Sequence, residues 1–599
     1  MPSKSLARPR GLPVADPASP ATVRALAREV GAAIPASEQQ PFAEAFCREA
    51  VAAYWTSAFG SPLPEPLALS APLPLNDWAS RQAGRLGSSL GGAPDAAAAY
   101  ALGVLYSGLI PEERRSRHGV YYTPPAIAVR LLEMVEREGI RWESARVLDP
   151  AAGGGAFMAP VAAKMAGALS AFGATPIEVL HHVERNLRGI ELDPFAAWMS
   201  EVFLQVALRS YCTAAGRPLD PVVVVGDALG SCRDSTAGFD LVVGNPPYGR
   251  ITPDARTRER FSRSIYGHAN LYGIFMDLAV RLTKPGGRIA FVTPASFLGG
   301  QYFKRLRQVL TAEAPPLALD FLRDRSGVFD EVLQETVLVV LGRGSAVQPV
   351  DVCATSPSPS SGPCQVTRLG RVPMAAASDE PWILPRNLRD AALLDRAREM
   401  PHRLRDLGLE VNTGPLVWNR HKDQLAASPG ADRHPLLWAE SILPGGGFSF
   451  RARRRNHQPY FSLRPGQNHL LLHGPAVLVQ RTTAKEQTRR LAAAVLPAEF
   501  VEMHDGVVVE NHVNVIRPRD RAGAPLRAVA ALLNSAVVDR LFRCISGSVA
   551  VSAYELAALP LPPPAVLREL DTLIDTGANS DAIERFLRGV YGERVEALA

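Results

Sequence analysis

The chain has 599 residues, of which 47% are hydrophobic, and its net charge is +6 at pH 7. This length exceeds one ordinary domain, and the apolar content is that of a globular protein with room for more than one core. No apolar run approaches the ~18 residues that cross a bilayer, and the first twenty residues hold no continuous apolar stretch, which argues against a membrane span and a signal peptide.

We therefore expect a soluble protein of the cytoplasm with no membrane partner. The cysteines agree with a reducing compartment, because they form no CxxC pair of a zinc ribbon and no disulfide framework. The sequence predicts no metal site. The six cysteines are scattered along the chain at Cys47, Cys212, Cys232, Cys353, Cys364 and Cys544.

Residues 1–105 are rich in alanine and predict a helical N-terminal extension. A helical stretch such as residues 37–55 (SEQQPFAEAFCREAVAAYW) alternates with loop-like stretches such as residues 61–77 (SPLPEPLALSAPLPLND). We find no chemical motif in this part of the sequence.

Residues 106–343 predict an α/β domain. Short β-branched runs alternate there with amphipathic helical segments, a pattern typical of a sheet covered by helices on both faces. The six runs are ARVLDP, LRGIEL, PVVVVGD, FDLVVGN, GRIAFVT and ETVLVVLG.

The remaining sequence predicts a connector and a second large domain. Residues 344–376 are rich in proline, serine and glycine and are interpreted as a linker. Residues 377–599 mix short strands with a late helix over residues 526–542 (LRAVAALLNSAVVDRLF), which indicates an α+β domain. No internal repeat is evident.

The positive charge is concentrated in this last domain. Residues 401–500 contain 14 Lys/Arg and 7 Asp/Glu, a net charge of 14 − 7 = +7, whereas the whole chain has 65 − 59 = +6. The rest of the chain therefore sums to about −1. A local basic surface attracts polyanions, although a solvated basic face gives the same pattern.

The first chemical motif is a Gly-rich turn over residues 147–157 (VLDPAAGGGAF). A predicted strand ends there at Asp149, and Gly153 and Gly155 let the backbone approach a ligand at the start of the next helix. Many nucleotide sites and ordinary tight turns share this feature, so it is weak by itself.

Two further acids follow the next two predicted strands, at Glu191 and Asp227. A carboxylate at the first position can accept both hydroxyl hydrogens of a ribose, and one at the second can meet an adenine amino group. Each acid alone would more simply cap the following helix, but three at successive strand ends favour a cofactor site. NAD is disfavoured because the turn lacks the GxGxxG spacing.

The second motif is Asn245-Pro246-Pro247-Tyr248, directly after a predicted buried strand. Two prolines make the backbone rigid, and the Asn245 side-chain oxygen and the Pro246 carbonyl can together accept both hydrogens of a planar amino group. Its nitrogen lone pair would then face an electrophile. Tyr248 offers a face on which a planar ring can stack.

These motifs resemble the gamma-class amino-methyltransferases of bacterial restriction–modification systems, the TaqI-like N6-adenine enzymes. The resemblance covers roughly residues 118–342 and, more loosely, the C-terminal region. It implies a Rossmann-like methyltransferase domain with a mixed sheet, S-adenosyl-L-methionine as cofactor, and a C-terminal domain that recognises the DNA target. The expected cofactor residues are Tyr122, Thr123, Pro124, Asp149, Ala151, Gly153, Gly155, Glu191 and Asp227.

The resemblance also assigns the catalytic residues. Asn245 to Tyr248 match the catalytic tetrapeptide, and Phe329 falls where the family carries an aromatic that stacks on the extruded base. A core phenylalanine at a strand entry explains Phe329 nearly as well. One departure is Gly154, since the family usually has serine or threonine there, which puts one cofactor contact in doubt.

Double-stranded DNA is the expected substrate, since a basic domain of this size can hold a duplex while one base is flipped out. Near the chain's end, residues 552–562 resemble the closing segment of the family's recognition domains. The side chains expected to contact DNA are Arg420, Lys422, Arg453, Arg454, Arg481 and Lys485.

The motifs are compatible with several different functions. The same tetrapeptide serves enzymes that methylate ribosomal RNA or a glutamine amide, but those chains generally lack a large basic domain. N4-cytosine methylation is chemically close, although serine commonly replaces Asn245 in such enzymes. A bifunctional restriction enzyme would contain the same motifs, and so would a DNA-binding module with an inactive methylase fold. We expect a monomer, and the sequence leaves open whether a restriction endonuclease accompanies it.

Overall fold

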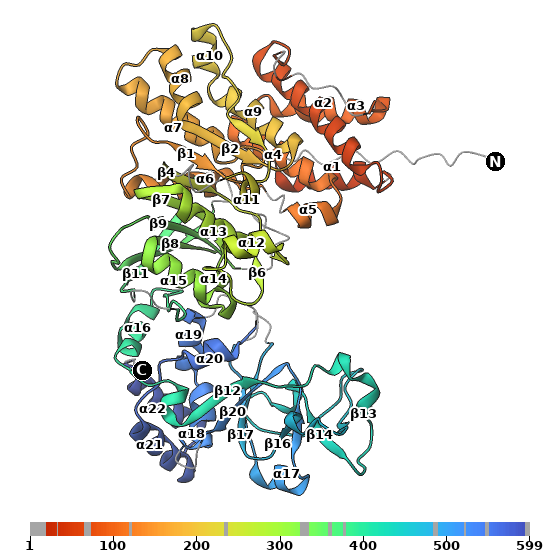
Figure 1. Ribbon diagram of the computed structural model, residues 1–599, viewed down its shortest axis with the longest axis vertical. Coiled ribbons are helices and arrows are strands. Elements are labelled where there is room, and N and C mark those ends of the chain that lie inside the picture. The colour runs from red at the N-terminus through yellow and green to blue at the C-terminus, as the bar shows by residue number, and fades with distance from the viewer. Residues whose placement is uncertain are drawn as a thin grey trace, which may run out of the picture.

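The computed structural model describes residues 19–32, 34–64, 67, 73–118, 122–232, 238–323, 335–357, 362–374, 379–482, 489–519, 523–545 and 550–592. Three parts follow one another along the chain: N-terminal helices, a central sheet between helices, and a C-terminal part with smaller sheets and closing helices (Figure 1). None of the described helices is both long and apolar enough to span a membrane.

The N-terminal part is helical, as its composition predicted. Its hydrophobic core is shared with the central part, because one face of the central helix α9 (Pro194–Ala207) packs into it. Trp198 of α9, for example, is buried there and donates its indole N–H to the Leu67 carbonyl at 2.8 Å. The N-terminal helices are α1 (Pro20–Gly31), α2 (Gln39–Phe59), α3 (Asp77–Leu90), α4 (Asp95–Leu109) and α5 (Glu112–His118).

The central part contains a mixed sheet whose nine described strands run in the order β11-β10-β8-β9-β7-β4-β1-β2-β3. All six predicted runs contribute strands, and β8, β10 and β11 were not predicted. The strands are β1 (Val147–Asp149), β2 (Leu187–Glu191), β3 (Val223–Val225), β4 (Phe239–Gly244), β7 (Thr283–Pro294), β8 (Pro316–Leu322), β9 (Thr336–Gly342), β10 (Val350–Ser356) and β11 (Gln365–Val372).

Helices cover both faces of this sheet, and successive side chains of one strand enter different cores. In β4, Val242 packs into one core, with residues of the helices α13 (Leu271–Leu282) and α15 (Lys304–Glu313). Leu241 and Val243 pack into another core, with residues of α6 (Pro125–Arg137), α7 (Met158–Ala171) and α8 (Pro176–Asn186). The helices of this part are α6 (Pro125–Arg137), α7 (Met158–Ala171), α8 (Pro176–Asn186), α10 (Arg209–Ala215), α11 (Ala228–Ser231), α12 (Ala255–Arg260), α13 (Leu271–Leu282), α14 (Ser296–Gly299) and α15 (Lys304–Glu313), besides α9.

The interpretation of residues 344–376 as a linker was wrong. β10 pairs parallel with β8 and antiparallel with β11, so this segment extends the central sheet by two strands. In β10 every second residue, Val350, Val352 and Ala354, is buried, which is the pattern of a strand. The prolines and glycines that suggested a linker lie mainly outside the two strands.

The C-terminal part contains a four-stranded sheet in the order β12-β20-β17-β18 and a five-stranded sheet in the order β13-β15-β14-β19-β16. The strands are β12 (Leu409–Thr413), β13 (Leu425–Ala426), β14 (Arg433–Leu437), β15 (Tyr460–Ser462), β16 (Leu471–Leu472), β17 (Ala476–Gln480), β18 (Ala493–Leu496), β19 (Val507–Val509) and β20 (Val513–Pro518). The helices are α16 (Asp390–Arg398), α17 (Ala498–Met503), α18 (Leu526–Leu533), α19 (Ala536–Ile545), α20 (Ala553–Ala557), α21 (Pro564–Asp575) and α22 (Ser580–Val590).

A buried arginine joins the central and C-terminal parts. The Arg307 guanidinium donates to the Phe297 and Gly300 carbonyls on one side, and to the Asp379 carbonyl and the Tyr554 hydroxyl on the other. Arg307 has no exposed surface, so water is excluded from this junction and the charge-assisted hydrogen bonds of Arg307 fix how the two parts meet.

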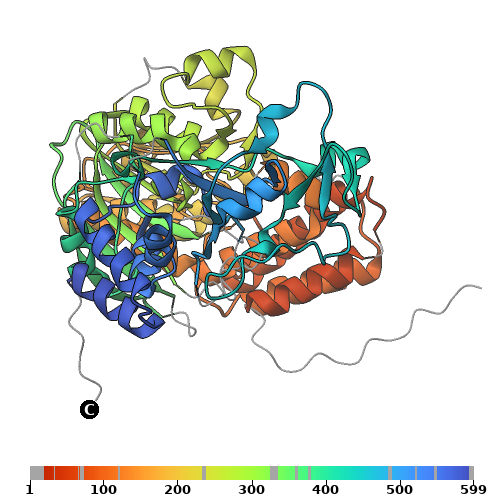
Figure 2. The same ribbon diagram turned by 90° about the horizontal axis from the view of Figure 1, so that it is seen from below.

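Viewed from below, the C-terminal strands overlie the N-terminal helices (Figure 2). In Figure 1 both project from the same side of the molecule.

The strand order reverses at β1. Strands β2 and β3 follow on one side of β1, whereas β4 pairs with β1 on the other side, and all these pairs are parallel. At such a switch point the connections leave the carboxyl ends of the strands in opposite directions and open a crevice between them. Asp149 ends β1, and Asn245 follows β4 at this crevice.

Candidate active site

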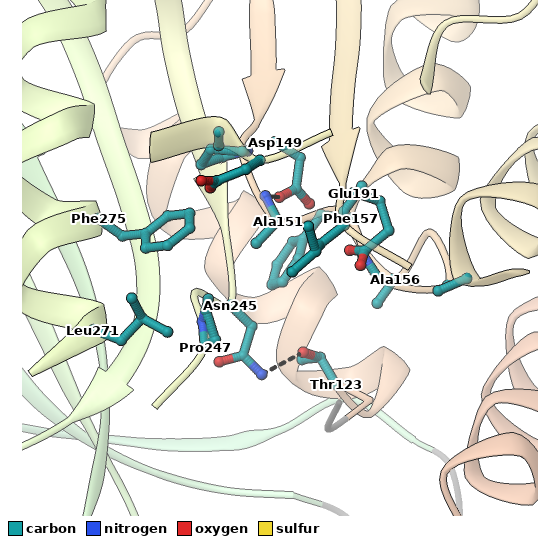
Figure 3. A pocket seen from close by; sticks show the side chains of 18 of the residues that line it. Thr123, Asp149, Ala151, Ala156, Phe157, Glu191, Asn245, Pro247, Leu271 and Phe275 are labelled. Atoms are coloured by element: carbon teal, nitrogen blue, oxygen red, sulfur yellow. Dashed lines mark hydrogen bonds between the residues drawn. The ribbon is translucent and has the colours of Figure 1, made fainter. Parts of the chain in front are cut away.

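A pocket opens at the switch point and brings together most of the predicted cofactor and catalytic residues (Figure 3). The predicted residues that line it are Tyr122, Thr123, Asp149, Ala151, Gly153, Glu191, Asp227, Asn245 and Pro247. Gly155 and Pro124 are not among the residues that line the pocket: Gly155 lies against Ser200 of α9, and Pro124 is the N-cap residue of α6. Phe329 lies outside the described residues.

The Gly-rich loop is held from both sides. Gly153 donates its N–H to Glu191 Oε2 at 2.7 Å, and its carbonyl accepts from the Ser200 hydroxyl at 2.6 Å. Gly153 and Gly155 both have a positive φ, and a Cβ on Gly155 would lie 3.1 Å from the Ser200 backbone. The left-handed backbone favours glycine at both positions, and the close approach to α9 adds a steric reason at Gly155 alone.

Asp149 is the most deeply buried acid of the pocket. Its Oδ1 accepts the Ala151 N–H at 3.0 Å, and Oδ2 has no hydrogen-bond partner among the described residues. Burial raises the pKa of Asp149 to about 8, and the nearby Glu191 carboxylate adds to this shift. The carboxyl packs against Gly244, where a Cβ would lie 2.6 Å from Oδ1, so the residue before Asn245 has to be a glycine.

Glu191 ends β2 and faces the Gly-rich loop. Its Oε2 accepts from Gly153 and its Oε1 from the Asp193 N–H at 2.8 Å, which leaves a lone pair on each oxygen for a ligand. Burial raises the pKa of Glu191, and these backbone N–H groups oppose that shift. The pair of oxygens is thus fixed at the pocket wall, as recognition of a ribose diol requires.

Asp227 both caps a helix and lines the pocket, the two functions between which the sequence did not decide. Its Oδ1 accepts the Leu229 N–H at 3.0 Å and so caps the short helix α11, and the residue also lines the pocket. Its side chain is exposed at the rim, which leaves Oδ2 accessible to a polar ligand group.

Tyr122 explains the glycine at position 154. A Cβ on Gly154 would lie 2.2 Å from Tyr122 Cε1, and one on Gly103 of α4 would lie 2.3 Å from Tyr122 Cδ1. The ring therefore fills the space between the loop and the N-terminal helices, where a serine or threonine side chain would otherwise stand. Burial raises the pKa of the Tyr122 hydroxyl, which has no hydrogen-bond partner in the described part of the chain.

The Asn245 amide is oriented by two partners. Its Nδ2 donates to the Thr123 hydroxyl at 3.1 Å, and its Oδ1 accepts from the Tyr248 hydroxyl at 2.7 Å (Figure 3 shows the first of these). An amide oxygen has two lone pairs, so one remains for a substrate hydrogen.

Tyr248 has a role that the sequence did not predict. Its hydroxyl also lies 3.2 Å from the Val292 carbonyl, and its ring meets the Tyr272 ring edge-on with 6.2 Å between centroids. Burial raises the pKa of Tyr248 far above its ordinary value, so the hydroxyl stays protonated as a donor. Neither Tyr248 nor Pro246 lines the pocket, and stacking on Tyr248 stays a prediction.

Sequence reasoning missed the apolar side of the pocket. Leu271 and Phe275 project from α13 opposite Glu191, and Phe157 closes the floor (Figure 3). The spacing of four residues places Leu271 and Phe275 on one helix face, but the same spacing is typical of core residues. No feature of the sequence separated these two functions.

The pocket fits S-adenosyl-L-methionine by the chemistry of its lining. An unpartnered carboxylate oxygen on Asp149 suits the cationic methionine end, Glu191 suits a ribose, and Asp227 with the apolar side chains suits an adenine ring. When bound, this cofactor supplies a methyl group on a sulfonium, which an amino nitrogen can accept.

The side chains predicted to contact DNA differ in their exposure and in whether they already form hydrogen bonds within the protein. Arg420 and Lys422 are exposed, and Lys422 lies over the Trp418 ring. Arg481 is partly tied down, since it donates to the Asn511 carbonyl at 3.0 Å. Lys485 lies outside the described residues.

Arg453 and Arg454 stand on an ordered turn. Glu440 Oε1 accepts from the backbone N–H groups of both, and from His457 Nδ1 at 2.7 Å. The His457 ring stacks on Trp438 with 3.8 Å between centroids. The two arginine side chains are exposed and have no carboxylate partner among the described residues.

The arginines after the tetrapeptide also divide into two groups. Arg260 donates to the Leu229 and Cys232 carbonyls, and Arg263 pairs with the buried Asp277, so both stabilise the fold. Arg250, in the two-stranded sheet of β5 (Arg250–Ile251) and β6 (Ala269–Asn270), and Arg258 are exposed.

Comparison with known proteins supports a methyltransferase. Residues 185–329 match the family described as Eco57I restriction-modification methylase. The chain is 27% identical to the Type II methyltransferase M.BsuBI of Bacillus subtilis over 76% of this chain and 90% of that protein. It is also 27% identical to the Type II methyltransferase M.PstI of Providencia stuartii, over 57% and 68% respectively.

A solved structure shares the fold over almost the whole chain. The Type IIL restriction-modification enzyme MmeI, determined in complex with DNA, aligns with 97% of this chain and 96% of its own chain at a TM-score of 0.51 and 12% identity. The predicted Rossmann-like α/β methyltransferase fold with additional domains is therefore confirmed. The match to the methylase family and the Type II methyltransferase relatives confirm the resemblance to restriction-modification methylases.

Proposed function

We propose that this chain is a site-specific DNA methyltransferase that transfers a methyl group from S-adenosyl-L-methionine to the N6 amino group of adenine in double-stranded DNA. It would serve as the modification component of a restriction–modification or phage-defence system. The observation that carries this proposal is the orientation of Asn245 by Thr123 and Tyr248, within one pocket with Glu191 and Asp149.

The chemistry assigned to the tetrapeptide needs no strong base. The free lone pair of Asn245 Oδ1 and the Pro246 carbonyl accept the two hydrogens of the target amino group, which directs its nitrogen lone pair toward the methyl group. As that nitrogen gains positive charge, both oxygens stabilise it. Once methylated, the nitrogen releases one of its hydrogens as a proton to water, and the thioether of the cofactor is the leaving group. Thr123 and Tyr248 keep the amide from rotating, so no reorganisation is required during the reaction.

The cofactor would lie along the switch-point crevice. Asp149, Glu191 and Asp227 bind its charged and polar groups, and the apolar wall of Leu271 and Phe275 excludes water beside them. The raised pKa of Asp149 fits this assignment, since a cationic ligand group is what would stabilise its ionised form.

DNA as the substrate is supported by two exposed basic regions and by the relatives. Arg453 and Arg454 on their fixed turn would contact phosphates or guanine edges, and Arg250 and Arg258 would contact the backbone near the extruded base. The N-terminal helices and the strands β13–β16 project from the same side of the molecule, above and below the central part (Figure 1). A duplex bound on that side would lie between them. The Type II methyltransferases and the DNA-bound restriction–modification enzyme named above are consistent with such a substrate.

The proposal is tested by offering labelled cofactor with duplex DNA, ribosomal RNA or a protein extract. Label should enter duplex DNA only, at a defined sequence, and Asn245→Ala should abolish transfer while binding S-adenosylhomocysteine as the wild type does. Label in RNA or protein but not in DNA would overturn the substrate assignment.

A further inference from the structure

Glu191, the carboxylate assigned to the ribose, is held in place by a neighbouring residue. Asp193 lies two residues after Glu191 and its backbone N–H donates to Glu191 Oε1 at 2.8 Å. The Asp193 side chain caps α9, because its Oδ1 accepts the Phe195 N–H at 3.0 Å. The position of Asp193 therefore sets both the start of α9 and the direction of one Glu191 oxygen.

The second oxygen of Asp193 is held from the N-terminal part. Tyr106 of α4 donates its hydroxyl hydrogen to Asp193 Oδ2 at 2.6 Å, in a fully buried contact. The Tyr106 hydroxyl in turn accepts from Gln40 Nε2 of α2 at 2.9 Å. Since Gln40 occupies the acceptor side of this hydroxyl, the hydroxyl hydrogen is free to point to Asp193.

The contact is stronger than an ordinary surface hydrogen bond. Tyr106 has no exposed surface and Asp193 is only 4% exposed, so water cannot replace a lost partner. The acceptor is a carboxylate, which makes the bond charge-assisted. The ring of Tyr106 packs on Phe195 with 4.8 Å between centroids, and this packing would survive removal of the hydroxyl.

We propose that Tyr106 is a positioning residue for the cofactor site and acts through Asp193 on Glu191. The N-terminal helices then contribute to the cofactor site, although they precede every methyltransferase motif in the sequence. This inference rests on the proposed function, because it takes Glu191 as the acid that binds the ribose.

The test uses Tyr106→Phe in the full chain, with Tyr54→Phe as a matched control. Tyr54 is also buried in the N-terminal core and donates to a carboxylate, Asp95 Oδ1 at 3.0 Å, but Asp95 has no hydrogen bond to Asp193 or Glu191 among the described residues. The same atom is removed in both variants. Binding of S-adenosylhomocysteine and of its 2′-deoxyribose analogue is measured by calorimetry, with thermal unfolding beside it.

We expect Tyr106→Phe to bind S-adenosylhomocysteine about tenfold more weakly than the wild type, the effect of one buried hydrogen bond. Because the lost orientation concerns the ribose acid, the difference in affinity between the two ligands should shrink in Tyr106→Phe and stay unchanged in Tyr54→Phe. A merely structural role would lower the unfolding temperature of both variants and weaken both ligands equally.

The inference is overturned if Tyr106→Phe binds S-adenosylhomocysteine within twofold of the wild type, or if the ligand difference does not shrink. A wild type that binds neither ligand overturns the proposed function together with this inference. A wild type that binds both, beside an unaffected Tyr106→Phe, overturns this inference alone.

Discussion

The hydroxyl of Tyr248 donates a hydrogen bond to Oδ1 of Asn245 at 2.7 Å, within the same four-residue turn. The aromatic residue of the tetrapeptide therefore orients the side chain that is to bind the target amino group. The opposite end of the amide is held by Thr123, which precedes α6 and comes from a distant part of the chain. Together these two hydrogen bonds restrain rotation of the amide.

Removal of this hydroxyl should slow the chemical step. In Tyr248→Phe the ring remains, so any stacking on the target base is retained, but the Asn245 amide loses one of its two restraints. We expect the single-turnover rate of methyl transfer to fall about tenfold, with little change in the affinity for DNA or for S-adenosylhomocysteine.

Tyr272→Phe is the control for this variant. Tyr272 is a buried tyrosine of the same aromatic cluster, and its hydroxyl contacts Ser296 at 2.7 Å and not Asn245. A Tyr248→Phe enzyme as fast as Tyr272→Phe would contradict the orienting role.

The buried acid at position 149 should make stability depend on pH. Burial raises its pKa to about 8 from an ordinary value of 3.8, so between these values the folded protein keeps a proton that the unfolded chain has released. Stability conferred at low pH is therefore lost as the pH rises through this window. Asp149→Asn keeps the acceptor for Ala151 and cannot ionise.

Urea unfolding of the cofactor-free protein at pH 5, 6, 7 and 8 measures this effect. The free energy of unfolding of the wild type should decline relative to Asp149→Asn at each step up in pH, by at most about 1.4 kcal/mol per pH unit. A difference that stays constant from pH 5 to pH 8 would show that Asp149 is already ionised in the folded protein.

Gly154 should not tolerate the hydroxyl residues usual at its position in the family. A Cβ there would lie 2.2 Å from Tyr122 Cε1, so Gly154→Ser has to displace the ring from between the loop and α4. We expect a loss of stability of about 1–3 kcal/mol, together with weaker binding of S-adenosylhomocysteine.

Gly167→Ser in α7 is the matched control, because nothing lies within 4 Å of a Cβ at that position. Denaturant unfolding and ligand titration of both variants compare the two sites. If Gly154→Ser were as stable as Gly167→Ser, the ring of Tyr122 would not be confined as described.

The exposed arginines of the turn held by Glu440 should contribute to DNA affinity through charge. Arg453→Ala and Arg454→Ala should each weaken binding of duplex DNA. Where the lost contact is to a phosphate, the slope of log K against log salt concentration should fall by about 0.9. Where it is to a base, recognition should relax at one position instead.

Arg464→Ala serves as the comparison, since Arg464 is exposed in the same basic region but pairs with Asp423. Binding is measured by fluorescence anisotropy over a range of salt concentrations. Equal effects of Arg453→Ala, Arg454→Ala and Arg464→Ala would mean that the turn has no special part in DNA binding.

Sequence patterns predicted the catalytic sheet well where the pattern has a single physical cause. β-branched runs located β1, β2, β4, β7 and β9, and Asp149, Glu191 and Asn245 at the carboxyl ends of β1, β2 and β4 do meet at one pocket. The run at Val223–Val225 also forms a strand, but it lies at the edge of the sheet, with Val224 and Val225 more than half exposed. Composition alone does not distinguish an edge strand from a central one.

Other features depended on contacts that are distant in sequence. The helix predicted over residues 526–542 is two helices, α18 and α19. Asn534 lies between these helices, and its side chain forms hydrogen bonds with both the N–H and the carbonyl of Ala493. The contact from Tyr106 to Asp193 spans 87 positions along the chain. Neither partner carries a local motif, so no spacing rule could have joined them.

The central claim is that Asn245 presents the N6 amino group of adenine for methylation. The most direct measurement is to methylate duplex DNA with the purified chain and S-adenosyl-L-methionine, digest it to nucleosides and identify the products by mass spectrometry. We predict N6-methyladenine from the wild type and none from Asn245→Ala that still binds S-adenosylhomocysteine. N4-methylcytosine as the product, or N6-methyladenine formed equally by Asn245→Ala, would contradict the claim.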